Sequence, residues 1–224
     1  MSTAAAARPR FDTVADVLAA VGDVPPHRIL WTPYPGTATE EDQLRLLDRE
    51  PKRLVELIDG ILVEKPMGHR ESLFAHTLGL FVGNFVTPRN LGVVGTPDAL
   101  MQFRNGRRLP DLSFTAWANL PSDDAHLQPC ADFAPDLAVE ILSADNSRRE
   151  MAQKRRDYFG SGTQVVWEID PDDRTVTVYT DPTTHTILTA ADTLTGDPVL
   201  PGFVLPLADL FNAPQLNPRP ARNP

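Results

Sequence analysis

The chain has one cysteine and no long apolar run, and both shortages restrict what it can be. Cys130 has no second thiol with which to form an intrachain disulfide or a thiolate zinc site. No stretch approaches the roughly 18 consecutive apolar residues of a membrane span, and the N-terminus lacks the apolar run of a signal peptide. We therefore expect a soluble protein from a reducing, cytoplasmic compartment.

Basic residues are also in short supply. The chain has 21 lysines and arginines against 30 aspartates and glutamates, a formal net charge of -9 and an isoelectric point near 5.0. Stable non-specific binding of nucleic acid draws on a basic surface, so this class of function is disfavoured. The cations nevertheless gather around Asp111 and Glu140, as a local basic rim that could contact a phosphodiester. They are Arg104, Arg107, Arg108, Arg148, Arg149, Lys154, Arg155 and Arg156.

Length and composition favour one main domain. A chain of 224 residues with 42% hydrophobic residues is long enough to bury one sizeable core. We place this domain at residues 51–211, after an extension of short helices over residues 1–50. Residues 1–11 and the proline-rich tail, residues 212–224, are expected to be disordered.

Capping signals and apolar spacing predict four helices. Thr39 is suited to cap a short helix, and Ser147 with Glu150 forms a capping box at the start of another. The longest helix is predicted from apolar residues that recur on one helical face. The four helices are expected over residues 13–21, 39–48, 69–86 and 147–159.

Turn dipeptides between apolar runs predict β-hairpins. Asp59-Gly60 and Asn105-Gly106 both favour the type I′ turn. Prolines argue against regular structure over residues 25–36, and the long loop over residues 116–134 is interpreted as a functional flap. Glu56 is expected to be an edge-strand glutamate in water, with reach into a site as the alternative. The predicted strands cover residues 54–58, 61–64, 91–94, 99–104, 107–114, 137–142, 164–169, 175–179 and 185–188.

Two acidic residues, Asp111 and Glu140, lie inside apolar runs predicted as neighbouring strands. A buried carboxylate costs free energy unless it is paired, so their placement requires an explanation. On the following helix, Met151, Lys154 and Tyr158 share the stripe that must face the sheet. Lys154 is therefore expected to direct its ammonium toward Glu140.

Two carboxylates and one ammonium suit metal-assisted hydrolysis of a phosphodiester. Carboxylate oxygens bind Mg²⁺, which keeps several waters and takes up substrate phosphates. The metal lowers the pKa of a bound water, and the ammonium would orient or deprotonate that water and stabilise the transition state. The alternative is a buried network of Asp111, Glu140 and Lys154 that only ties two strands to a helix, because structural ion pairs can imitate catalytic sites.

Six segments of the chain form an ordered set of motifs. They are residues 54–60 (LVELIDG), 110–111 (PD), 139–143 (VEILS), 154–159 (KRRDYF), 167–171 (WEIDP) and 199–203 (VLPGF). In this order they resemble the Uma-two restriction endonuclease family, which belongs to the PD-(D/E)xK nuclease superfamily. Each segment alone is a weak signal, and the combination is specific.

The resemblance implies a restriction-endonuclease-like α/β fold, in which helices flank a mixed β-sheet, with extra N-terminal helices and β-hairpins. It implies a DNA endonuclease that depends on Mg²⁺ or Mn²⁺. Asp111 and Glu140 match the metal-binding carboxylates. Leu142 stands where the superfamily usually has its lysine, and Lys154 matches the lysine of this family.

Four further residues complete the candidate site. Arg108, Arg148 and Arg155 are candidate contacts to the substrate, and Glu56 is a candidate accessory carboxylate. A homodimer is expected, since two sites are the simplest way to cut both strands of a symmetric duplex. The alternative function is a catalytically silent domain for nucleic-acid binding or protein interaction on the same fold, which the acidic composition favours. The sequence specifies neither a target site nor the choice between DNA and RNA.

Overall fold

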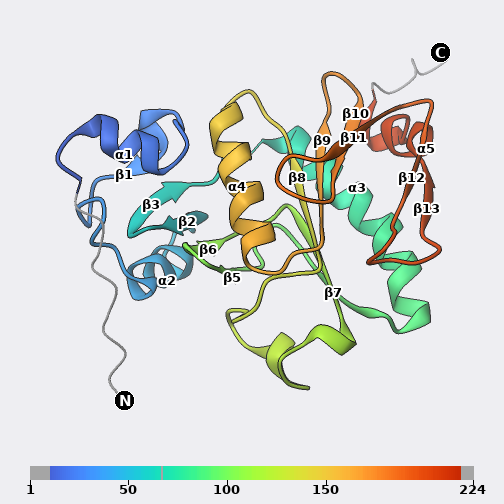
Figure 1. Cartoon of the computed structure of the whole chain (residues 1–224), viewed down its shortest axis with the longest axis horizontal. Helices are drawn as coiled ribbons and strands as arrows, with labels where there is room; N and C mark the ends of the chain where they lie inside the picture. Colours follow the sequence, from blue (N-terminus) through green and yellow to red (C-terminus); the bar gives the residue numbers. More distant parts are fainter. Residues whose placement is uncertain (1–10, 67, 218–224) are drawn as a thin grey trace, which may run out of the picture.

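Two β-sheets hold most of the strands (Figure 1). The computed structural model describes residues 11–66 and 68–217. The first sheet has five strands in the spatial order β1 (Ile29–Leu30), β3 (Ile61–Glu64), β2 (Val55–Ile58), β6 (Gly106–Arg108) and β5 (Met101–Phe103). The second has six, in the order β11 (His185–Thr189), β10 (Thr175–Tyr179), β9 (Val165–Asp170), β8 (Leu137–Ile141), β7 (Leu112–Ala116) and β4 (Gly92–Gly95). A third, two-stranded sheet pairs β12 (Thr193–Thr195) with β13 (Val204–Pro206).

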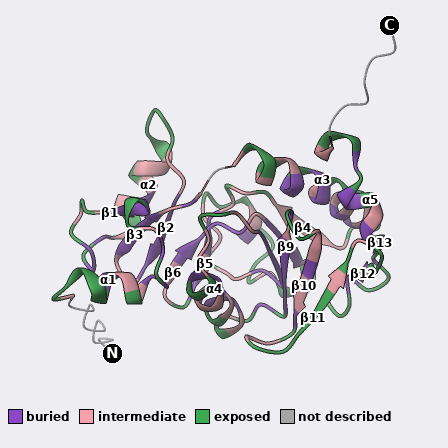
Figure 2. Ribbon diagram, turned by 90° about the horizontal axis from the view of Figure 1, so that it is seen from above, coloured by how far each residue is buried: buried purple, intermediate pink, exposed green. Residues whose placement is uncertain are grey.

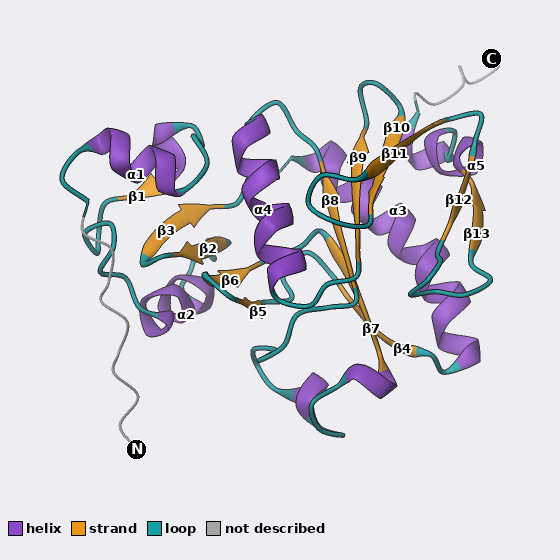
Figure 3. Cartoon of the chain, in the orientation of Figure 1, coloured by secondary structure: helices purple, strands orange, loops and turns teal. Residues whose placement is uncertain are grey.

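In the described part of the chain, five α-helices surround these sheets (Figure 3). They are α1 (Val14–Ala20), α2 (Glu40–Asp48), α3 (His69–Val86), α4 (Arg148–Gly160) and α5 (Leu207–Phe211). The capping boxes predicted for α2 and α4 are present, with Thr39 and Ser147 as the N-caps. None of the helices in the described ranges combines the length and the apolar composition that a membrane span requires.

The six-stranded sheet is mixed and has helices on both faces (Figure 2). β8 and β9 are parallel and are connected by α4, whereas the neighbouring pairs β7–β8 and β9–β10 are antiparallel. Leu137 and Val139 of β8 share a core cluster with Phe74 of α3, while Ala138 shares another cluster with Tyr158 of α4. This arrangement confirms the predicted fold class and places α4 on the same face of β8 as Glu140.

The hairpin between β2 and β3 shows how local sequence fixes the backbone. Asp59 and Gly60 both have positive φ, 48° and 75°, as a type I′ turn requires. A Cβ added at Gly60 would lie 2.7 Å from the backbone carbon of Gly36, so the position needs glycine for space as well as for φ. The predicted hairpin is confirmed.

The strand predicted over residues 107–114 is wrong in one respect. β6 ends at Arg108 and β7 begins at Leu112, and the two strands belong to different sheets. Pro110 lies in the link and has no N–H to offer a β-ladder, which explains the break. Asp111 therefore lies in the crossing between the sheets, at the start of β7, and not on the arm of a hairpin.

Two predictions of irregular structure also need correction. Leu30 of β1 pairs with Leu62 of β3, so residues 25–36 are not wholly irregular. Residues 212–217 contain a 3-10 turn, Pro214–Leu216, in place of the expected disorder, and Gln215 Nε2 donates to Thr77 Oγ1 at 3.0 Å. Residues 1–10 and 218–224, also expected to be disordered, lie outside the described residues.

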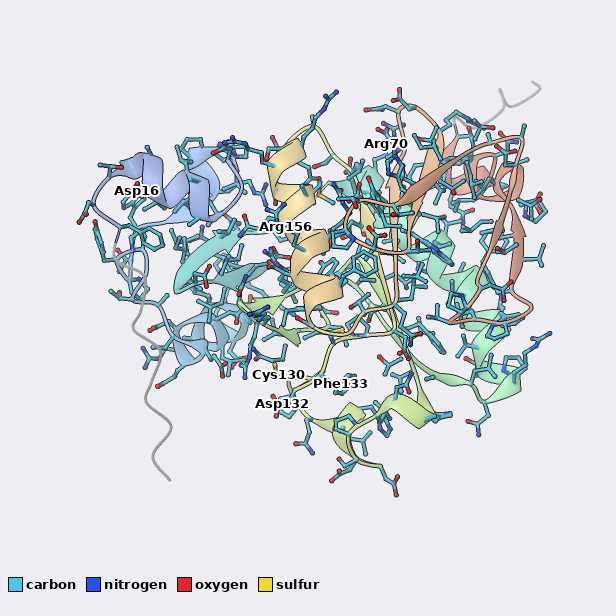
Figure 4. All side chains as sticks on the ribbon, viewed as in Figure 1. Asp16, Arg70, Cys130, Asp132, Phe133 and Arg156 are labelled. Carbon is cyan, nitrogen blue, oxygen red and sulfur yellow. The ribbon has the colours of Figure 1, made fainter. Side chains whose placement is uncertain are left out.

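The long loop after β7 contains two 3-10 turns and is tied to the first sheet near its end. Met101 of β5 forms a bridge with Ala131, and Gln102 N–H donates to Ala131 O at 2.9 Å. Figure 4 shows the neighbouring side chains of Cys130 and Asp132 on this stretch, beside the first sheet. The flap role stays a prediction.

Candidate active site

Five of the seven predicted site residues lie where the two large sheets meet. β2 and β6 of the first sheet contribute Glu56 and Arg108. β8 of the second sheet contributes Glu140, the link before β7 contributes Asp111, and α4 contributes Lys154. Residues that are far apart in the sequence thus form one group of charges, which is buried except for the partly exposed Asp111.

Asp111 is held against β8 by both its backbone and its carboxylate. Its N–H donates to Val139 O at 2.9 Å, and its Oδ2 accepts from Ile141 N–H at 2.7 Å. Oδ1 lies 2.8 Å from Lys65 Nζ. Val139 and Ile141, the two β8 residues that bond to Asp111, flank Glu140 in the sequence. These contacts therefore hold the Asp111 carboxylate beside Glu140.

Lys154 reaches Glu140, as the helical stripe predicted. Its Nζ is 2.9 Å from Glu140 Oε2 and 3.3 Å from Glu56 Oε1. Tyr158, one turn further along α4, donates its hydroxyl to Glu140 Oε1. Only 1% of Lys154 is exposed, so its ammonium is enclosed between two carboxylates.

Glu56 is not the water-exposed glutamate that was expected. It is 1% exposed, its Oε2 is 3.0 Å from Arg108 Nη1, and its Oε1 accepts from Leu109 N–H at 3.3 Å. On its other side, Arg108 donates to the carboxylate of Asp157. Arg108 is thus buried between two carboxylates, which corrects its assignment as a substrate contact.

Burial and neighbouring charges displace the pKa values of this group. Burial would raise the pKa of Glu56, but Lys154 and Arg108 outweigh it and hold that pKa at about 2. Burial raises the pKa of Glu140; Lys154 opposes this rise and the Asp111 carboxylate adds to it. Burial would lower the pKa of Lys154, yet Glu140 and Glu56 raise it above its ordinary value. Lys154 is therefore a stable ammonium.

A small cavity lies within the site. It has a volume of about 20 Å³, and its lining includes Asp111, Glu140, Glu71 and Lys154. This is room for about one water molecule or ion. A larger groove of about 260 Å³ lies next to it and runs beside the start of α3, and Asp111 lines this groove as well.

The donor set fits a divalent cation of the Mg²⁺ type. Such ions take oxygen ligands, often only one or two carboxylates, and keep several waters. No group of three or more His, Cys, Asp or Glu within residues 11–66 and 68–217 is arranged to hold a metal. Asp111 and Glu140 line the cavity and match the two carboxylates that the sequence predicted as ligands. The charges also fit a divalent cation. Five carboxylates and three cationic side chains leave an excess of two negative charges, which one divalent cation would offset. The carboxylates are Glu56, Glu71, Asp111, Glu140 and Asp157, and the cationic side chains are Lys65, Arg108 and Lys154.

The other two predicted arginines line a separate cleft of about 810 Å³ between α4 and strands β9 to β11. Arg148 is exposed at the start of α4. Arg155 is partly buried, because it pairs with Glu168 and its guanidinium lies 4.3 Å from the ring centre of Tyr179. Of these two arginines, only Arg148 could bind a ligand without breaking an ion pair.

Sequence reasoning missed Lys65, whose ammonium pairs with Asp111, and Glu71 of α3. A compositional signal for Lys65 existed. The chain has eighteen arginines but only three lysines, Lys52, Lys65 and Lys154. Two of these three lysines are buried at the site.

Residues 40–208 match the sequence profile of the Uma2 (Uma-two) family, which is described as "Putative restriction endonuclease". Among solved structures, a protein from Anabaena variabilis ATCC 29413 described as a putative nuclease belonging to DUF820 is similar, with a TM-score of 0.67 and 25% sequence identity. The alignment covers 77% of this chain and 96% of that chain. No curated protein sequence matches the chain.

Proposed function

Because this chain belongs to the Uma2 family of putative restriction endonucleases, we propose that it is a metal-dependent endonuclease that hydrolyses phosphodiester bonds of DNA. The family is the one that the order of motifs indicated. The observation that carries the proposal is the convergence of Asp111, Glu140 and Lys154 on one cavity at the junction of two sheets. Carboxylates and an ammonium in this grouping suit a phosphodiester and a divalent cation.

Asp111 and Glu140 would hold Mg²⁺ or Mn²⁺. When bound, the metal supplies a Lewis acid that lowers the pKa of a coordinated water and offsets the negative charge of the phosphate. The Ile141 N–H and the Tyr158 hydroxyl each donate to one of the two carboxylates and fix its orientation. Such fixed ligands lose little freedom when the metal and substrate arrive.

Lys154 would act as a charge and a hydrogen-bond donor. Its raised pKa keeps the proton on Nζ at neutral pH, so the orienting role is favoured over deprotonation of the attacking water. An ammonium enclosed by protein stabilises a developing negative charge more strongly than one in water. Glu56, which shares this ammonium with Glu140, would position it.

The remaining parts of the proposal are broader. We propose that the nuclease domain spans residues 51–211, with residues 1–50 as an extension and residues 212–224 as a tail. We also propose a homodimer, because two sites would cut the two strands of a duplex. The lone cysteine, Cys130, is consistent with a cytoplasmic location.

The test is nicking of supercoiled plasmid DNA by the full chain in Mg²⁺, Mn²⁺ or EDTA. Wild type should nick only with a divalent metal, and Asp111→Asn and Glu140→Gln should each lose at least about 10²-fold in rate. Glu41→Gln is the matched control, because Glu41 is exposed on α2 and pairs with Arg45 in an i, i+4 contact.

Two results would overturn the proposal. One is a wild type that leaves the plasmid intact in both metals, and the other is a pair of site variants that cut as fast as Glu41→Gln. A wild type that binds DNA or a protein partner without cutting would support the catalytically silent alternative, which the net charge of -9 favours for a protein partner.

A further inference from the structure

Lysine is rare in this chain, and its positions are informative. Two of the three lysines, Lys65 and Lys154, are buried beside the proposed metal carboxylates, while Lys52 has a side chain that is 47% exposed. A lysine ammonium is a compact charge with three rotatable donors, which suits a narrow space better than a planar guanidinium. Lys154 already has a role in the proposed function, and Lys65 does not.

Lys65 stands at the entrance of the site. Four residues line both the 20 Å³ cavity and the 260 Å³ groove, namely Lys65, Pro66, Glu71 and Asp111. Lys154 and Glu140 line the small cavity but not the groove. A phosphate that approaches through the groove would therefore meet the Lys65 ammonium before it meets Lys154.

The Lys65 ammonium is held in place by two contacts and can donate one more hydrogen bond. Its Nζ donates to Leu109 O and lies 2.8 Å from Asp111 Oδ1. These are its only two polar partners within the described ranges, so one of its three N–H donors is left for another acceptor. Leu109 itself is fully buried and donates its N–H to Glu56, which makes this anchor rigid.

We propose that Lys65 is a second catalytic lysine, which donates a hydrogen bond to a non-bridging oxygen of the scissile phosphate. This inference rests on the proposed nuclease function. In this arrangement Lys65 binds the phosphate from the groove side, while Lys154 stays beneath the metal carboxylates with Glu140. The two ammonium groups, Lys65 at the entrance and Lys154 inside the cavity, would share the charge that develops in the transition state.

A structural role for Lys65, as a counter-charge for Asp111 alone, predicts different behaviour toward DNA. A phosphate contact contributes about 0.9 to the slope of log binding constant against log salt concentration, because its formation releases a counterion. A lysine that only neutralises Asp111 contributes nothing to this slope. The salt dependence of binding therefore separates the two roles, whereas a loss of activity alone would not.

The experiment uses the full chain with a fluorescein-labelled DNA duplex, with Ca²⁺ in place of Mg²⁺ to suppress cleavage. For Lys65→Met, we expect the slope to fall by about 1 and plasmid nicking in Mg²⁺ to fall at least about 10²-fold. The control is Arg45→Met, because Arg45 is exposed on α2, pairs with Glu41 in an i, i+4 contact and lines neither the cavity nor the groove. It should keep the wild-type slope and rate.

Thermal melting shows whether Lys65→Met is folded. If it is not, Lys65→Gln replaces it, since glutamine keeps an N–H donor for Leu109 O and Asp111, and the same two changes are expected. A wild type that cuts, beside a Lys65 variant with an unchanged salt slope, would overturn this inference and leave the nuclease function standing. A wild type that does not cut would overturn both.

Discussion

Replacing Glu56 by glutamine removes one negative charge from beneath the site and keeps the size of the side chain. Glu56 Oε2 is 3.0 Å from Arg108 Nη1, and Oε1 is 3.3 Å from Lys154 Nζ. The three side chains are 2% to 3% exposed. The substitution therefore leaves two buried cations with one carboxylate fewer, at a place that solvent does not reach.

The expected loss is about 3 kcal/mol of unfolding free energy. Removing one partner of a buried ion pair costs about 3–5 kcal/mol, because an uncompensated charge stays buried. Arg108 keeps Asp157 and Lys154 keeps Glu140, which favours the lower end of this range. A pKa of Glu56 lowered from 4.5 to about 2 corresponds to a similar figure, roughly 3 kcal/mol, at about 1.36 kcal/mol per pKa unit.

The assay is urea unfolding followed by circular dichroism at pH 7 in metal-free buffer. Glu41→Gln is the control, since Glu41 is 75% exposed and its pair with Arg45 should contribute at most about 0.5 kcal/mol. If Glu56→Gln were no less stable than Glu41→Gln, the reasoning that these buried charges stabilise the fold would be refuted.

The Glu56 carboxylate also determines how the stability of the fold changes in acid. The pKa of Glu56 is lower in the fold than in the unfolded chain, so its stabilisation is fully present above about pH 4.5 and is lost as the pH falls toward about 2. Wild type should lose stability across this window more steeply than Glu56→Gln. Unfolding curves that lose stability in parallel would contradict the assignment.

Three further substitutions test separate parts of the structure. Burial and the Asp111 carboxylate raise the pKa of Glu140 against the pull of Lys154, so its charged form adds less to stability than that of Glu56; Glu140→Gln should lower nicking at least about 10²-fold and should lower the melting temperature at pH 8 by less than Glu56→Gln does. Tyr158→Phe removes the hydroxyl that donates to Glu140 and should cost about 1–3 kcal/mol, a fall of several degrees in calorimetric melting temperature. Gly60→Ala combines positive φ with a 2.7 Å approach to Gly36 and should cost at least about 1 kcal/mol in urea unfolding, whereas an alanine at Gly160, with nothing within 4 Å, should be tolerated.

Features that depend on residues a few positions apart could be predicted from the sequence. The α3 helix has the predicted bounds, Ser147 and Glu150 form the predicted capping box, and Asp59-Gly60 makes the predicted turn. The approach of Lys154 to Glu140 belongs to the same class, because one connection joins β8 to α4. Helical and strand periodicity together were sufficient to orient both side chains toward each other.

Features that depend on distant partners could not be predicted. Glu56 looked like a solvent-exposed strand residue, since the cations that bury its charge, Arg108 and Lys154, come from β6 and α4. Lys65 follows β3 with no acidic residue of its own strand facing it; Asp111 meets it only because Pro110 breaks the strand and turns the chain into the second sheet. The same holds for Arg108, because its two carboxylate partners, Glu56 and Asp157, are about 50 positions away in the sequence and do not reveal themselves there.

The two carboxylates that share Lys154 have pKa values shifted in opposite directions: that of Glu56 is lowered and that of Glu140 is raised. This difference indicates different roles for the two residues. The charge of Glu56 is favoured by Lys154 and Arg108, so it strengthens the junction between the sheets. The charge of Glu140 is disfavoured by burial and by Asp111, although Lys154 is nearer to Glu140, at 2.9 Å, than to Glu56, at 3.3 Å. A protein selected only for stability has no reason to keep a carboxylate that disfavours the charge of buried Glu140, whereas a protein that binds a cation there has one. If Asp111 and Glu140 hold a divalent cation as proposed, that cation would offset the effect of Asp111 on Glu140, and this part of the burial cost would be recovered on binding.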